Sequence, residues 1–184
     1  MEILETGFKN LSIIKPTIFK DSRGYFYESY NRRILHNLGI TCTFVQDNQS
    51  ESSFGVIRGL HYQINPHAQA KLVRVLHGEI YDVAVDLRAG SPTHGKYYGI
   101  ILSSLNNLQL FIPQGFAHGF AVLSPKAVVL YKTDEFYHKE SERGIVYNDQ
   151  ALNIDWQIPP SKVTVSDRDM NLPVFGEHEA QFIF

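Results

Sequence analysis

The chain has only one cysteine, Cys42, among its 184 residues. A single thiol cannot form a disulfide within the chain, and it excludes a metal site built from several thiolates. Long apolar runs are also missing, because charged residues interrupt every apolar cluster near the N-terminus. Neither a signal peptide nor a membrane span of about 20 residues is predicted. We therefore expect a cytoplasmic protein with no membrane partner.

An excess of charge of either sign is lacking as well. Lys and Arg number 17 against 19 Asp and Glu, so the formal net charge is -2. A nearly neutral protein has no general attraction for nucleic acid, and any anionic ligand must be held by a few local Arg or Lys side chains. With no internal repeat or low-complexity tract, the sequence predicts one domain, residues 1–184.

Short apolar or alternating runs, separated by turn residues, make up most of the chain. This rhythm is typical of an all-β sandwich or barrel. The predicted strands are residues 11–19, 41–46, 71–76, 79–87, 97–102, 108–112, 120–123 and 127–132. Turn residues at 77–78, 106–107 and 124–126 predict hairpins between consecutive strands.

Only one segment has a clear helical pattern. Residues 31–38 place Ile34, Leu35 and Leu38 on one side and end at Gly39, a natural residue for a helix C-terminus. A second short helix or a loop is expected within residues 140–154. The predicted fold class is all-β, a cupin-type double-sheet jelly roll with a few short helices.

His61 lies in the segment GVIRGLHYQ, residues 55–63. In an extended chain His61 and Ile57 point one way and Arg58 points the other, unless Gly59 introduces a bulge. His61 is then directed into the barrel. Such a histidine is a hydrogen-bonded structural residue, a metal ligand or an acid/base group, and on its own the structural role is the most common.

Spacing argues against the metal alternative. Metal-binding cupins resemble one another in a G-x5-H-x-H stretch and a later P-x-G-x2-H stretch. Gly55 to His61 and Pro113 to His118 fit these stretches, but Gln63 stands where the second histidine is expected. In principle, His67, His77 and Glu79 could substitute. We expect no metal and no other cofactor.

Proton transfer next to a carbonyl needs a base near the C–H bond, a cation near the developing enolate oxygen and an acid on the other face. His61, Lys71 and Tyr131 could fill these roles in turn. The alternatives are an ion-paired surface lysine and a tyrosine at the cavity rim. Asp82 and Asp86 share one face of a predicted strand, where we expect them to be solvated or ion-paired.

Many motifs follow one another along the chain. They include D-x-R-G-x-F-x-E at 21–28, Q-D-N-x-S at 46–50, R-G-L-H-Y-Q at 58–63, K-L-V-R-V at 71–75, D-V-A-V-D-L-R at 82–88 and P-x-G-F-A-H-G-F at 113–120. In these motifs the chain resembles the dTDP-4-dehydrorhamnose 3,5-epimerases, which are nucleotide-sugar epimerases of the cupin superfamily. The resemblance extends from about the N-terminus through Pro173.

The resemblance implies catalytic roles. His61 is the expected base, oriented by Asp169 or, as the alternative, by Asp167, and Tyr131 is the acid on the opposite face of the sugar. Lys71 is expected to meet the enolate, and Tyr137 to stack on thymine. The implied substrate-binding residues are Arg23, Glu28, Gln46, Asn48, Arg58, Lys71, His118, Tyr137 and Glu142.

The implied reaction inverts C3 and C5 of dTDP-4-dehydro-6-deoxy-D-glucose, without a metal, in dTDP-L-rhamnose biosynthesis. A homodimer is expected, in which the predicted strand 11–19 could complete the partner's sheet. The alternatives are an epimerase acting at one carbon of a related 4-keto sugar, a metal-dependent cupin enzyme and a non-catalytic binder of sugar nucleotides. Departures from the family pattern at residues 133–136 and at His94 bear on which base or sugar is preferred.

Overall fold

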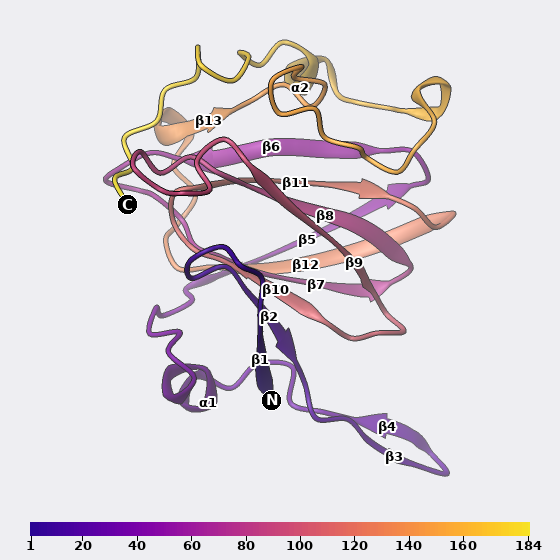
Figure 1. Cartoon of the computed structure of the whole chain (residues 1–184). Helices are drawn as coiled ribbons and strands as arrows, with labels where there is room; N and C mark the ends of the chain where they lie inside the picture. The colour runs from indigo at the N-terminus through magenta and orange to yellow at the C-terminus, as the bar shows by residue number, and fades with distance from the viewer.

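Two antiparallel sheets face each other in the computed structural model, which describes residues 1–184 (Figure 1). The six-stranded sheet has the order β1 (Glu2–Glu5), β2 (Ser12–Lys15), β10 (Gln109–Ile112), β7 (Lys71–His77), β12 (Lys126–Thr133) and β5 (Gln46–Ser53). The five-stranded sheet has the order β13 (Glu142–Gly144), β6 (Ile57–Gln63), β11 (Phe116–Val122), β8 (Glu79–Asp86) and β9 (Tyr97–Ser103). The predicted all-β jelly roll is confirmed.

The remaining elements are short. They are the hairpin β3 (Phe19–Asp21) and β4 (Gly24–Phe26), the helices α1 (Arg32–Asn37) and α2 (Asp167–Met170), and the 3-10 turns η1 (Lys139–Ser141) and η2 (Pro160–Lys162). The β3–β4 hairpin stands away from the two sheets in Figure 1. None of the helices has the length and apolar character needed to cross a bilayer.

The central strands of the five-stranded sheet, β8 and β11, are buried on both faces. On β8, Ile80 and Ala84 pack in the cluster between the two sheets, while Val83 and Val85 pack against Trp156 on the other side. The cluster that contains Trp156 forms because the chain after β13 folds back over the outer face of that sheet. The pattern of one buried and one solvated face, expected for residues 81–87, is therefore wrong.

The three predicted hairpins are also wrong. Residues 77–78 join β7 of one sheet to β8 of the other, residues 106–107 join β9 to β10, and residues 124–126 join β11 to β12, again between sheets. Turn residues determine where the chain reverses, whereas burial of whole strand faces decides which strands pair. Gly78, for example, has a φ of 78°, and a Cβ there would lie 2.1 Å from the carbonyl oxygen of Lys126.

Most predicted strands lie close to observed ones, with two exceptions, while β1, β4, β6 and β13 were not predicted. Residues 41–45 form no strand; β5 begins at Gln46 and runs through the polar sequence QDNQSESS. The predicted strand 11–19 shrinks to β2, which pairs with β1 and β10 of its own chain and so is not free to complete a partner's sheet. Helix α1 is confirmed, with Asn31 capping its first turn and Gly39 following at a φ of 93°. Of the helix or loop expected at residues 140–154, the loop is observed, preceded by part of η1 and by β13.

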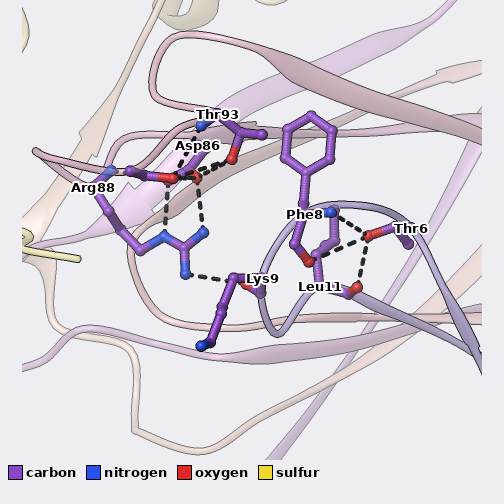
Figure 2. Close-up of polar contacts among 8 residues, drawn as sticks. Thr6, Phe8, Lys9, Leu11, Asp86, Arg88 and Thr93 are labelled. Carbon is purple, nitrogen blue, oxygen red and sulfur yellow. Dashed lines mark hydrogen bonds and ion pairs between the residues drawn. The ribbon is translucent and has the colours of Figure 1, made fainter.

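Asp86 fixes the N-terminal segment to the barrel (Figure 2). Its carboxylate accepts hydrogen bonds from Arg88, Ser91 and Thr93, and Arg88 also donates to the carbonyl oxygen of Lys9. Burial raises the pKa of Asp86, but these hydrogen bonds outweigh it and lower the pKa to about 2. Asp86 is thus ion-paired, as the sequence predicts.

Candidate active site

A cavity of about 650 Å³ opens between the two sheets and is lined from β5, β6, β7, β11, β12, β13 and α2. It brings together every predicted site residue except Arg23 and Glu28. Those that line it are Gln46, Asn48, Arg58, His61, Lys71, His118, Tyr131, Tyr137, Glu142 and Asp169.

A bulge in β6 turns both Arg58 and His61 toward this cavity. Along the ladder with β11, His61 lies opposite His118 while Arg58 lies opposite Phe120, so β6 contains one extra residue. The extra residue reverses the alternation of a regular strand, which otherwise directs these two side chains to opposite faces. Gly59 is required at the bulge, because a Cβ there would lie 2.5 Å from the Cα of Gly119.

His61 and Asp169 form a hydrogen-bonded pair. Nε2 of His61 lies 2.8 Å from Oδ1 of Asp169, and Oδ2 of Asp169 accepts the backbone N–H of Gly59 at 3.1 Å. Burial raises the pKa of Asp169, but hydrogen bonding to His61 and Gly59 outweighs it and holds the pKa below its ordinary value. An ionised Asp169 accepts a hydrogen bond from the N–H of Nε2, which leaves Nδ1 of His61 as the nitrogen with a free lone pair.

Of the two aspartates left open by the sequence, Asp169 makes this contact. Asp167 is exposed at the start of α2 and makes no hydrogen bond with His61. The hydroxyl of Ser166 caps the helix by accepting the backbone N–H of Asp169 at 3.1 Å. The short helix α2 thus places the carboxylate of Asp169 at the cavity wall.

A second histidine, His118, lines the cavity and pairs with an aspartate, Asp82, that does not line it. Nε2 of His118 is 2.8 Å from Oδ1 of Asp82, and both side chains are almost fully buried. Burial lowers the pKa of His118, although Asp82 acts in the opposite direction. Of the two alternatives expected for Asp82, solvated or paired, the first is wrong because the side chain is buried, and the second fits its contact with His118. Oδ2 of Asp82 has no hydrogen-bond partner.

Lys71 and Tyr131 enter the cavity from the sheet opposite His61. Nζ of Lys71 donates to the carbonyl oxygen of His61 at 3.2 Å and lies 5.9 Å from the centre of the Tyr131 ring. Burial lowers the pKa of Lys71 to about 8, against the opposing effect of nearby carboxylates, and burial raises the pKa of Tyr131. His61 belongs to the five-stranded sheet and Tyr131 to the six-stranded sheet, so a ligand between them meets one group on each side.

The outer end of the cavity carries a charged network. Arg168 contacts Glu142 at 2.6 Å, and the hydroxyl of Tyr137 donates to Glu142 at 2.7 Å. Burial raises the pKa of Glu142, but these two partners outweigh it and keep the pKa below its ordinary value. Nearby, Nε of Arg58 donates to the hydroxyl of Ser52 at 2.9 Å. Two guanidinium groups therefore border one rim of the cavity.

Comparison with known proteins shows the family of the chain. Residues 5–177 match the family model described as dTDP-4-dehydrorhamnose 3,5-epimerase. The chain belongs to this epimerase family. A relative of that name from Shigella flexneri is 49% identical over 172 residues, covering 93% of this chain and 94% of the relative.

Solved structures of the family superpose closely on the chain. The dTDP-4-dehydrorhamnose 3,5-epimerase of Elizabethkingia anophelis is 53% identical, with a TM-score of 0.93 over 96% of this chain and 97% of that one. The RmlC protein of Legionella pneumophila, a dTDP-6-deoxy-D-glucose-3,5-epimerase in complex with dTDP-4-keto-L-rhamnose, is 50% identical, with a TM-score of 0.90 over 96% and 93% of the two chains. Members of this epimerase family are isomerases.

Arg23 and Glu28 do not reach the cavity of their own chain. Arg23 lies in the turn between β3 and β4, fully exposed to solvent apart from its ion pair with Asp21 at 2.6 Å. Glu28 is exposed and accepts a hydrogen bond from Asn31. The family motif at residues 21–28 is thus separated from the other predicted site residues within one chain.

The cavity has no cluster typical of a metal site. No three histidine, cysteine, aspartate or glutamate side chains converge in the structure. None of the three residues that could have substituted for the missing ligand lines the cavity: His67, His77 and Glu79. Gln63, at the position of the missing histidine, uses its amide in hydrogen bonds to backbone atoms.

Asp82, Arg168 and Gln63 are among the functional residues that sequence reasoning missed. Asp82 had a usable signal, because it is a charge between apolar residues of β8 and sits two strands from His61 in the same sheet. Arg168 directly precedes Asp169, which placed it near the site. Gln63 was noted only for the ligand that it replaces, and nothing in its spacing indicated which backbone atoms it binds.

Proposed function

We propose that this chain inverts C3 and C5 of dTDP-4-dehydro-6-deoxy-D-glucose to give dTDP-4-dehydro-L-rhamnose. Family membership supports the reaction, and one feature of the geometry carries the mechanism. A histidine oriented by a carboxylate and a tyrosine enter one cavity from opposite sheets. A base on one side of a sugar ring and an acid on the other are what inversion at a carbon requires.

The 4-keto group makes the hydrogens on C3 and C5 acidic. In the proposed step, Nδ1 of His61 takes the proton from the carbon, and the C–H electron pair moves into an enolate. Tyr131 then gives its hydroxyl proton to the opposite face of the same carbon, and the carbonyl re-forms. The resulting imidazolium and tyrosinate exchange protons with solvent, which restores both groups before the second carbon reacts.

Lys71 supplies the positive charge for the enolate oxygen. It is buried, so its charge acts through little water and is worth more than at the surface. At neutral pH a lysine of pKa about 8 is still mostly protonated. His118, held by Asp82, borders the same part of the cavity and is proposed to contact the sugar.

The nucleotide is proposed to occupy the rim. Tyr137 is half-exposed, with its hydroxyl tied to Glu142, which leaves a ring face for thymine. Arg58 and Arg168 offer planar multi-donor groups to the diphosphate. Gln46 and Asn48, hydrogen-bonded to each other at 2.9 Å, complete this wall. The dTDP-sugar bound to the Legionella relative supports this class of ligand.

A homodimer in the cytoplasm is part of the proposal. Phe19, Tyr25 and Phe26 on the β3–β4 hairpin are each at least 60% exposed, an unusual cluster of aromatic rings in contact with water. The same hairpin carries Arg23, which its own cavity does not use. We propose that the hairpin packs on a second copy of the chain and there adds Arg23 and Glu28 to the partner's site.

The configuration of the product tests the reaction. The purified protein is incubated with dTDP-4-dehydro-6-deoxy-D-glucose, and proton coupling constants of the product are measured by NMR. Inversion at both carbons gives the L-sugar. A product inverted at one carbon only would show the single-centre alternative, and unchanged starting material would contradict an epimerase.

A further inference from the structure

Gln63 holds the segment that carries Tyr137. Its side chain is 3% exposed and makes three hydrogen bonds to backbone atoms. Nε2 donates to the carbonyl oxygens of His67 at 2.6 Å and Phe136 at 3.1 Å, and Oε1 accepts the N–H of His138 at 2.6 Å. Two of these contacts fall on the residues directly before and after Tyr137.

Neighbouring side chains fix the same segment, residues 135–138, which we call the platform loop. Gln69 donates to the carbonyl oxygen of Glu135 at 2.7 Å, and Gln46 accepts the N–H of Tyr137 at 3.2 Å. Glu142, which accepts the hydroxyl of Tyr137, lies directly opposite Gln63 in the β6–β13 ladder. Each residue of the platform loop is therefore held by a side chain from the wall of the cavity.

Gln63 has no donor left for a ligand. A primary amide has two N–H bonds, and both are used within the protein. Its influence on a bound molecule must therefore pass through the platform loop. An exposed tyrosine on an unrestrained loop loses conformational entropy when a base stacks on it, whereas a ring held in place loses much less.

We propose that Gln63 is a positioning residue for the nucleotide, setting the affinity for the thymine base through Tyr137. This inference rests on the proposed function, because it takes a thymidine diphosphate as the ligand of the rim. Metal-binding cupins have a ligand histidine at this position, whereas Gln63 binds backbone atoms of the platform loop and of His67. Gln63 accordingly affects binding of the base and leaves the proton-transfer groups unchanged.

Calorimetric titration with dTDP tests this role by a double-mutant cycle of Gln63→Met and Tyr137→Ala. Methionine keeps the length of the side chain and removes all three hydrogen bonds. Gln63→Met is expected to weaken dTDP binding about ten-fold and to raise KM for the dTDP-sugar by a similar factor, with kcat within about two-fold of wild type. In the Tyr137→Ala background it should cause no further loss.

Three controls separate positioning from general destabilisation. Ser103→Ala removes another buried polar side chain, which accepts the N–H of Asn106 and does not line the cavity, and should lower Tm without weakening dTDP binding. Inorganic pyrophosphate, which lacks the base, should bind Gln63→Met and wild type equally. Gln63→Asn keeps an uncharged amide on a shorter side chain and provides a second variant, with a smaller loss, if Gln63→Met does not fold.

Two results would overturn the inference. One is that Gln63→Met lowers dTDP affinity by the same factor in the wild-type and Tyr137→Ala backgrounds. The other is that neither Gln63 variant changes the affinity for dTDP. If wild type binds dTDP but inverts no carbon, the proposed function fails and this inference stands. If the cycle is additive while epimerisation proceeds, the inference alone fails. Absence of dTDP binding by wild type would contradict both.

Discussion

Asp169 follows His61 by 108 residues in the chain, yet its Oδ1 atom lies 2.8 Å from Nε2 of His61. The contact depends on two local features. The bulge at Gly59 turns His61 inward, and the cap of Ser166 on α2 directs Asp169 to the same wall. Because Asp169 also binds the N–H of Gly59, the carboxylate joins the base to the bulge that orients it.

Replacing Asp169 should impair the base without displacing the substrate. Asp169→Asn presents an amide that no longer selects the tautomer with a free Nδ1, so we expect kcat to fall by about 10² to 10⁴ with KM little changed. Asp167→Asn is the matched control, because Asp167 is two residues away and exposed. Steady-state kinetics of the two variants make the comparison. Equal loss in both, or near-normal turnover by Asp169→Asn, would contradict the pairing.

Removing the acid should separate proton removal from inversion. In Tyr131→Phe, His61 can still take a proton and return a deuteron to the same face, so deuterium should enter recovered substrate from D₂O while product forms at least about 100-fold more slowly. His61→Ala should show neither exchange nor product. Mass spectrometry of recovered substrate measures the exchange. Exchange that persists in His61→Ala would assign the base to another group.

Lys71 should set an alkaline limit on activity. The proposed role needs the protonated amine, whose pKa is about 8, so log kcat/KM should be level toward neutral pH and fall as pH rises through about 8. Lys71→Met should lose about 10² to 10³ in kcat, since one oxyanion donor is removed. Lys126→Met removes a surface lysine paired with Glu51 and should keep both rate and profile. If kcat/KM stays level and falls only near pH 10.5, the ordinary pKa of a lysine, Lys71 does not have this role.

The same burial predicts how Lys71 affects stability. A lysine whose pKa is lower in the folded state than in the unfolded state releases its proton first in the folded state. The charged form therefore costs folding free energy below about pH 8, and this cost shrinks as pH rises toward the unfolded value. Lys71→Met should have a Tm equal to or above that of wild type at pH 7, with the difference narrowing by pH 9. A clear loss of Tm at pH 7 would indicate a structural role.

Trans complementation tests the shared site. Arg23→Ala and His61→Ala are each expected to be nearly inactive. When the two are mixed, unfolded and refolded together, mixed dimers contain one site in which both defects coincide and one site with neither. Activity should then recover to about a quarter of wild type, since half of the dimers are mixed and each has one intact site of two. No recovery, or a monomer by light scattering, would place Arg23 outside the partner's site.

The sequence predicted the fold class and most strand positions because apolar alternation reports burial directly. It failed on strand pairing, since the residues at 77–78, 106–107 and 124–126 have the same turn chemistry whether a chain stays in one sheet or crosses to the other. Strand β5 was missed because the side chains that it directs inward are polar and face the cavity. Its sequence therefore lacks the alternating apolar residues by which a strand is predicted. Pattern reasoning assumes an apolar interior, and a binding site violates that assumption.

Most of the site was predictable, and the reason differs between residues. Motifs located His61, Lys71 and Tyr131, and the structure places them around one cavity. The partner of His118 was marked only by its charge. Asp82 is buried because it shares the face of β8 that Ile80 and Ala84 direct between the two sheets, and the sequence did not show which face points inward. The exposure of Arg23 likewise depends on where a hairpin points, which local residues do not determine.

Deuterium labelling of the product most directly tests the central claim, that protons are removed and returned at both carbons beside the 4-keto group. The protein is incubated with dTDP-4-dehydro-6-deoxy-D-glucose in D₂O, and the C3 and C5 proton signals of the product are integrated by NMR. The account predicts that both signals disappear as the L-sugar forms, because Tyr131 delivers a solvent-derived deuteron at each carbon. An L-sugar that retains protium at C3 or C5 would contradict it.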